Sequence, residues 1–209
     1  MRLLSTISTW LALLALSHAA VDDSCENEGP NMASYMDAKS GVTYKLAIPA
    51  VSRPQFPLLM SITAPKNVTW AGFATGGAMV GDPLLVAYPN DDTAVVSSRW
   101  ATSHTPPALY NNTKITVFKS SGSNATHWTA NFICCKGCSS WINGSIDPLS
   151  HNETFGFAVS SKPVALPSSP SSPIGYHNVN HGRFGLDMSS ARNDAEQFAA
   201  LVKTFKASA

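Results

Sequence analysis

The sequence contains little charge and none of the short motifs that mark common nucleotide, zinc or serine-hydrolase sites. Only 13% of its 209 residues are charged, and the formal net charge at neutral pH is +1. Lys and Arg are scattered along the chain, so there is no electrostatic footprint for a nucleic acid or an anionic membrane. P-loop, GxGxxG, HExxH and GxSxG motifs are all missing. The sequence therefore signals no nucleotide or flavin site, no zinc helix and no serine nucleophile.

Long apolar runs are confined to the N-terminus, although hydrophobic residues make up 44% of the chain, enough for a folded core. Arg2 precedes an apolar stretch, residues 3–16, that is too short to span a membrane. Ser17-His18-Ala19 has small residues at the two positions that signal peptidase reads. We therefore predict a signal peptide over residues 1–19. Residues 20–209 are then expected to form a single secreted, extracellular domain with no membrane or nucleic-acid partner.

Two extracellular enzyme classes are disfavoured. A copper monooxygenase acting on polysaccharides needs histidine at its mature N-terminus, whereas this chain would begin Ala20-Val21. No spacing among the thirteen acidic residues singles out a carboxylate pair for glycoside hydrolysis. We accordingly assign no catalytic residue.

N-glycosylation sequons are frequent for a chain of this length, and each of them marks a surface loop. Five follow the predicted signal peptide, which agrees with secretion. The predicted glycosylation sites are Asn67, Asn111, Asn124, Asn143 and Asn152.

Cysteine is scarce, but the four cysteines of a secreted chain favour two disulfides. Cys135 and Cys138 can close a short local ring, and Cys25 is then left to pair with Cys134. A zinc site or a thioredoxin-like redox pair is a weaker interpretation, because neither a second ligand pair nor a βαβ setting is present. Covalent c-type haem attachment needs histidine directly after the second cysteine, where Ser139 stands. Any haem must therefore be held non-covalently.

Short segments rich in Val, Ile, Thr and aromatic residues recur between Pro, Gly, Asn and Asp, and some alternate apolar and polar residues at a period of two. Many short strands without intervening helices predict an all-β, immunoglobulin-like antiparallel sandwich of two sheets. The predicted strands are residues 42–48, 58–63, 69–74, 84–88, 94–100, 114–119, 128–133 and 155–160.

The C-terminal part differs in pattern. Residues 166–173 form a Pro/Ser-rich connector, expected to be extended and exposed. A short amphipathic helix is predicted over residues 191–206, with Ser189 or Ser190 as its N-cap. Its expected apolar face consists of Ala195, Phe198, Ala199, Val202 and Phe205.

Two segments carry the strongest motifs. In the first, Gly76-Gly77 precedes Met79, and Pro89 follows Met79 ten residues later after a Leu-Leu-Val-Ala-Tyr run. In the second, Tyr176-His177 is followed by Gly-Arg-Phe-Gly at positions 182–185. With both motifs in order, the chain resembles the cytochrome domain of fungal cellobiose dehydrogenases, a member of the wider DOMON group.

Two further stretches fit that resemblance, which runs from about residue 25 to residue 188. Arg99-Trp100-Ala101-Thr102 looks like an Arg-aromatic-Ala-Thr stretch of the family. Cys135-x-x-Cys138-x-x-Trp141 looks like its disulfide-and-tryptophan segment. The resemblance implies a two-sheet sandwich that holds haem b at one end.

The family's axial ligands correspond to Met79 and His177, with His181 as the competitor for the second position. The resemblance also places Tyr176, Phe184 and Trp100 against the haem. Arg99 and Arg183 can each pair with a haem propionate, but a solvated surface position is favoured for both, and His104 is expected near the pocket. A neutral thioether favours ferrous iron, so Met/His ligation raises the reduction potential and leaves no open position for dioxygen.

We therefore predict a monomeric one-electron carrier rather than an autonomous enzyme. Because no flavin fingerprint follows, a separate flavoenzyme or a small reductant is the expected electron donor. A copper polysaccharide monooxygenase, ferric iron or a quinone is the expected acceptor. Two alternatives stay open: a haem-free DOMON-like module that binds a carbohydrate or another ligand, and an extracellular ferric reductase.

Overall fold

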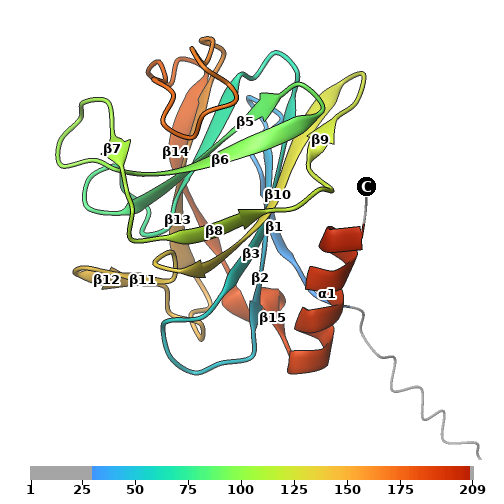
Figure 1. Cartoon of the computed structure of the whole chain (residues 1–209). Helices are drawn as coiled ribbons and strands as arrows, with labels where there is room; N and C mark the ends of the chain where they lie inside the picture. Colours follow the sequence, from blue (N-terminus) through green and yellow to red (C-terminus); the bar gives the residue numbers. More distant parts are fainter. Residues whose placement is uncertain (1–29, 208–209) are drawn as a thin grey trace, which may run out of the picture.

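The computed structural model describes residues 30–207, which form two β-sheets packed face to face (Figure 1). The signal peptide predicted over residues 1–19 and the cysteine Cys25 lie outside the described residues. Within the described part, the antiparallel sandwich with one C-terminal helix confirms the predicted fold class.

The first sheet has the strand order β1-β2-β3-β10-β8, with β9 added to β10 and a short parallel strand, β15, added to β2. Its strands are β1 (Ala33–Met36), β2 (Thr43–Pro49), β3 (Leu58–Pro65), β8 (Lys114–Val117), β9 (Gly122–Ser123), β10 (His127–Lys136) and β15 (Arg192–Asn193).

The second sheet has the order β14-β13-β4-β5-β6-β7, and all its pairs are antiparallel. Its strands are β4 (Trp70–Ala74), β5 (Pro83–Asn90), β6 (Thr93–Trp100), β7 (Ala108–Leu109), β13 (Glu153–Ser160) and β14 (Asn180–Leu186). A separate hairpin is formed by β11 (Ser140–Trp141) and β12 (Gly144–Ser145).

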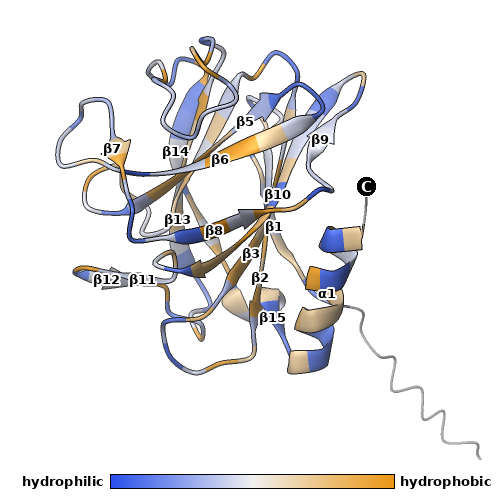
Figure 2. Ribbon diagram, in the orientation of Figure 1, coloured by the Kyte–Doolittle hydropathy of each residue, from blue (hydrophilic) through white to orange (hydrophobic). Residues whose placement is uncertain are grey.

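Every predicted strand corresponds to a strand of the sandwich, with ends that differ by a few residues. The core fills the space between the sheets, because alternate side chains of each strand point inward. From the second sheet these include Phe73, Leu85 and Phe155, and from the first Tyr44 and Phe132. Apolar residues accordingly follow the strands of both sheets, whereas polar residues are common in the loops (Figure 2).

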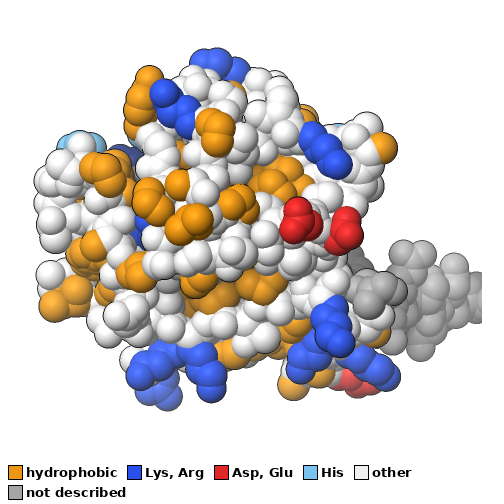
Figure 3. Space-filling model, turned by 45° about the horizontal axis from the view of Figure 1, so that its top comes forward, with side chains coloured by type: hydrophobic (Ala, Val, Ile, Leu, Met, Phe, Trp, Pro, Cys, Tyr) orange, Lys and Arg blue, Asp and Glu red, His pale blue; other side chains and the backbone are white. Residues whose placement is uncertain are grey.

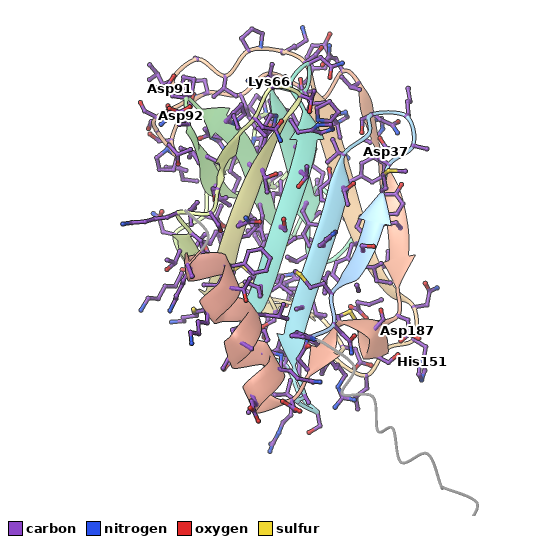
Figure 4. All side chains as sticks on the ribbon, turned by 90° about the vertical axis from the view of Figure 1, so that its right-hand side faces the viewer. Asp37, Lys66, Asp91, Asp92, His151 and Asp187 are labelled. Atoms are coloured by element: carbon purple, nitrogen blue, oxygen red, sulfur yellow. A yellow bond between two sulfur atoms is a disulfide. The ribbon has the colours of Figure 1, made fainter. Side chains whose placement is uncertain are left out.

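The C-terminal helix α1 (Ala195–Ala207) lies against the outer face of the first sheet (Figure 4). It contacts Ala47, Leu59, Phe118 and Ile133 through a narrow apolar face. That face consists of Phe198, Leu201, Val202 and Phe205, so the predicted members Ala195 and Ala199 are wrong and Leu201 was missed.

The predicted start of the helix is also wrong. Ser189 and Ser190 belong to a 3-10 turn, Met188–Ala191, which is followed by β15. The helix is capped by Asp194, whose carboxylate accepts the Gln197 N–H at 2.8 Å while the Gln197 side chain accepts the Asp194 N–H at 3.1 Å. This reciprocal capping box satisfies two backbone donors at the first turn.

The disulfide joins Cys134 to Cys138, not Cys135 to Cys138 as predicted. Successive side chains of a strand point to opposite faces, so Cys134 is buried whereas Cys135 is exposed. Gly137, with a positive φ of 80°, turns the chain so that the buried Cys138 meets Cys134. The predicted Cys25–Cys134 pair is excluded with it, and Cys25 itself lies outside the described residues.

The surface has no concentrated basic area in the view of Figure 3, where Lys and Arg lie in several separate groups. Within residues 30–207, no helix combines the length and the apolar character needed to cross a membrane.

Candidate functional site

A cavity of about 770 Å³ lies on the outer face of the second sheet. Its floor consists of the side chains that alternate with the core residues of β4, β5 and β13. Apart from the Trp70 indole, they are small or aliphatic: Gly72, Ala74, Leu84, Val86, Gly156 and Ala158. The floor is therefore flat and apolar, and the glycines allow a planar ligand to approach the backbone closely.

Three loops and the edge strand β14 form the walls. Residues 77–80 follow β4, residues 104–107 follow β6, and residues 174–177 lead into β14. Met79 enters from the first loop, half-buried against Ala74, Leu84 and Ala101. His177 enters from the third loop and is also half-buried. The two residues predicted as iron ligands thus line one cavity, although they are 98 positions apart in the sequence.

His181 lines the same cavity, with its ring centroid 4.3 Å from that of His177. It is exposed and lies on strand β14 rather than in a loop. The Nδ1 atom of His177 is buried and has no hydrogen-bond partner. Burial, followed by the effect of His181, lowers the pKa of His177 from its usual value. The neutral imidazole, the form that can bind a metal, is therefore favoured at neutral pH.

Tyr176 also lines the cavity, but it is 69% exposed, and the Lys162 ammonium lies 4.2 Å from its ring centroid. His104 lines the cavity from the loop that follows β6. Arg183 is the only Lys or Arg among the described residues that lines the cavity, and it is exposed there, as favoured.

Two residues predicted to pack on a haem lie elsewhere, because both occupy strand positions that face away from the cavity. Phe184 is only 8% exposed and stacks on Tyr35 in the core, with ring centroids 4.0 Å apart. Trp100 stacks on Tyr110 in a separate depression of about 390 Å³ beyond the loop at residues 104–107. Neighbouring side chains of a strand point to opposite faces of the sheet. Arg99 and Trp100 on β6 therefore face opposite ways, and so do Arg183 and Phe184 on β14.

The surface position favoured for Arg99 is wrong, because this side chain is 5% exposed. It donates hydrogen bonds to the backbone carbonyls of Pro107, Pro170 and Ser172 and to the Ser97 hydroxyl. It therefore links the loop at residues 104–107 to the Pro/Ser connector.

The apolar floor was not predicted from the sequence, although small residues occur there at alternate positions of the segments that form β4 and β13.

The residues present fit a planar iron porphyrin. The floor is flat and apolar, a thioether and an imidazole line the walls, and a buried imidazole nitrogen lacks a partner. No group of three or more His, Cys, Asp or Glu side chains in residues 30–207 is arranged to hold a bare metal ion. This fold and this donor set are typical of a β-sandwich cytochrome.

The chain belongs to the family described as the cytochrome domain of cellobiose dehydrogenase, whose model matches residues 25–199. The resemblance seen in the motifs is thus confirmed, and membership implies haem binding and electron transfer. The family is extracellular.

Two solved structures share the fold. The cytochrome b domain of pyranose dehydrogenase from Coprinopsis cinerea matches with a TM-score of 0.74 and 25% identity, covering 83% of this chain and 89% of that chain. The cytochrome domain of Myriococcum thermophilum cellobiose dehydrogenase matches with a TM-score of 0.70 and 22% identity, covering 83% and 97%.

A curated relative, the pyrroloquinoline quinone-dependent pyranose dehydrogenase of Coprinopsis cinerea, is 29% identical over 196 residues. The match covers 90% of this chain but only 27% of that relative. The chain thus corresponds to about a quarter of the length of the curated protein it matches.

Proposed function

We propose that this domain binds haem b non-covalently between Met79 and His177 and carries single electrons outside the cell. The observation that carries the proposal is that both donor side chains line the same cavity on the outer face of the second sheet. Residues 1–19 serve as a signal peptide, and residues 20–209 act as a single domain.

When bound, haem b supplies a one-electron couple, and the protein residues determine which reactions it can enter. Met79 offers a soft, neutral ligand that favours the reduced state. If Met79 and His177 both bind the iron, no coordination position is left for dioxygen or peroxide. The apolar floor would keep water away from a porphyrin held in the cavity. These features favour outer-sphere electron transfer over oxygen chemistry.

Two observations support non-covalent attachment. Cys134 and Cys138 are joined to each other, so neither thiol is available for a thioether link to the porphyrin. Neither cysteine lines the cavity.

His177 is the better candidate for the second ligand. Its ring is half-buried and its buried Nδ1 has no partner, whereas His181 is exposed. We assign His181 to the cavity rim, where its side chain restricts the space available to the His177 ring.

The partners follow from the relatives. A relative of the chain is a quinone-dependent sugar dehydrogenase, and the family takes its name from another sugar dehydrogenase. We propose that the electron donor is an extracellular sugar dehydrogenase, with a copper polysaccharide monooxygenase, ferric iron or a quinone as acceptor.

The test is the absorption spectrum of recombinant protein made with haem available, oxidised and then reduced with dithionite. The proposal expects a low-spin b-type spectrum, a high-spin ferric spectrum in Met79→Ala, and loss of haem in His177→Ala. The matched variant His181→Ala is expected to remain low-spin. A colourless wild-type protein would contradict haem binding and favour the ligand-binding alternative. A low-spin His177→Ala protein alongside a haem-free His181→Ala protein would reverse the ligand assignment.

A further inference from the structure

Met79 lies in a short loop, residues 75–82, that joins β4 to β5. At its base the Thr75 N–H donates to the Pro83 carbonyl at 3.2 Å. Gly77 and Gly81 both have a positive φ, 83° and 84°, so the backbone reverses on either side of Met79. Such a loop needs further hydrogen bonds to fix the position of its central side chain.

The first contact comes from Asp82, at the end of the same loop. Its carboxylate accepts the Ala78 N–H at 2.7 Å, directly before Met79. The carboxylate also fills the space beside Gly76, where any Cβ atom would overlap it. Burial raises the pKa of Asp82, while the Ala78 N–H, the charge of Arg183 and a hydrogen bond from Trp141 oppose that rise. The carboxylate therefore lies between the loop, β14 and the β11–β12 hairpin.

The second contact comes from Arg183 on strand β14. Its Nε atom donates to the Gly77 carbonyl at 2.7 Å. That carbonyl also packs directly on β13, because a Cβ atom at Gly156 would lie 3.0 Å from it. The backbone at Gly77 is thus held between two strands, and the backbone at Ala78 is held by Asp82.

From these contacts we infer that Asp82 and Arg183 act as a clamp that positions the Met79 thioether in the cavity. Both are positioning residues, since they hold the two backbone groups that precede Met79 and do not occupy the ligand position. The inference rests on the proposed ligation by Met79. A thioether is a weak ligand for ferric iron, so a loosened loop should release it in the oxidised protein before the reduced protein.

The experiment compares Asp82→Ala and Arg183→Met with Asp82→Asn and with Arg53→Met, an exposed cation outside the cavity lining. Purified haem-loaded proteins are examined by ferric and ferrous absorption spectra, by redox titration, and by titration of the ferric protein with imidazole. Asp82→Asn keeps an oxygen that can accept the Ala78 N–H, so it should restore most of the wild-type behaviour.

Asp82→Ala and Arg183→Met are expected to show a high-spin fraction in the ferric state only and a lowered reduction potential. Their affinity for imidazole should rise about tenfold, as expected for the loss of one hydrogen bond to a charged group. In the Met79→Ala background the same substitutions should cause no further change, because the group they position is gone. Arg53→Met should match the wild type throughout.

The outcomes separate the clamp from the proposed function. If the wild type is low-spin and Met79→Ala is high-spin, but both clamp variants keep the wild-type potential and imidazole affinity, the clamp is wrong and the ligation stands. Equal effects of Asp82→Ala with and without Met79 would also reject the clamp. If Met79→Ala itself keeps the wild-type spectrum, the proposed ligation fails.

Discussion

At the scale of single residues, Arg99 is a buried cation that donates hydrogen bonds to one hydroxyl and three backbone carbonyls. Burial is the main cause that lowers its pKa. The closest of its contacts, 2.5 Å from one terminal nitrogen to the Ser172 carbonyl, reaches the connector that leads to His177. Tyr88 adds a hydrogen bond to the Ser169 carbonyl in the same connector.

Replacing Arg99 should therefore weaken both the fold and the cavity. Arg99→Met leaves several buried carbonyls without a donor, which we expect to lower the free energy of unfolding by about 3 kcal/mol. Arg99→Lys should lie between Arg99→Met and the wild type, because one ammonium cannot reach all four acceptors. Urea unfolding with and without haem measures both effects, and an unchanged midpoint in Arg99→Met would show that the connector is held by other contacts.

Replacing the adjacent cysteines Cys134 and Cys135 should have very different effects on stability. Cys134→Ser opens a small disulfide ring and is expected to lower the free energy of unfolding by about 2 kcal/mol. Cys135→Ser changes an exposed side chain and should leave stability within experimental error. Urea unfolding of the two variants, with peptide mapping of the non-reduced protein, makes the comparison. A destabilised Cys135→Ser protein that retains a Cys134–Cys138 link would indicate that Cys135 has a partner of its own.

These residues show what the sequence could specify. Met79 and His177 could be recognised because each lies in a motif with a characteristic spacing. The residue type alone, a methionine or a histidine, would not have indicated a haem ligand. Phe184 and Trp100 were wrongly predicted to contact the haem. A motif shows which residues are close along the chain, but it does not show which face of the sheet each side chain occupies. Asp82 and Arg183 had no signal as a pair, since their meeting depends on the register of β14 beside β13.

At the scale of elements, apolar segments with strand propensity were predictable and the edges of the fold were not. Strand β14 was missed because two glycines and a positive charge interrupt its pattern, yet it pairs with β13 at seven positions. Its stability comes from that ladder and from inward-facing Phe184 and Leu186. The helix boundary was misjudged because serine at positions 189 and 190 looks like a cap, whereas Asp194 and Gln197 together form the actual one.

The turn after β14 carries a pH-dependent contact. The exposed Asp187 caps the 3-10 turn by accepting the Ser189 N–H at 2.9 Å, and it lies beside His151 (Figure 4). Hydrogen bonds from Ser189, with a smaller effect of His151, lower the pKa of Asp187 below its usual value of 3.8. A lowered carboxyl pKa stabilises the fold above 3.8, and this contribution is lost as the pH falls through the lowered value.

Asp187→Asn tests whether stability falls on acidification as argued above, because asparagine can still accept the Ser189 N–H but does not titrate. The wild type should be slightly more stable than Asp187→Asn at neutral pH, and the difference should vanish as the pH falls below 3.8. Urea unfolding across this range measures it. His151→Gln should keep most of the pH dependence, since Ser189 is the larger cause. A difference that grows on acidification would contradict the assignment.

At the scale of the whole molecule, the positions of the sequons bear on access to the cavity. All five sequon asparagines are exposed, and none of them lines the cavity. No glycan would therefore be attached to a residue that lines the cavity. A carrier that exchanges electrons with a large partner needs access to the cavity, because electron transfer between proteins requires the redox centres to come close.

We therefore expect the glycans to be neutral for electron exchange. Protein from a secretory host should lose one glycan in each single Asn→Gln variant, as measured by gel mobility and mass. Enzymatic removal of all glycans should leave unchanged both the haem spectrum and the rate of reduction by a dehydrogenase partner.

A new glycan at the rim provides the contrasting case. Ser103→Asn creates an Asn-His-Thr sequon at positions 103–105, next to the cavity residue His104. A glycan there should slow reduction by a protein donor but not by dithionite, which is small enough to pass. The same variant made without glycans separates the sugar from the substitution. If native glycans slow the protein donor as much as this one does, the partner approaches a surface other than the cavity mouth.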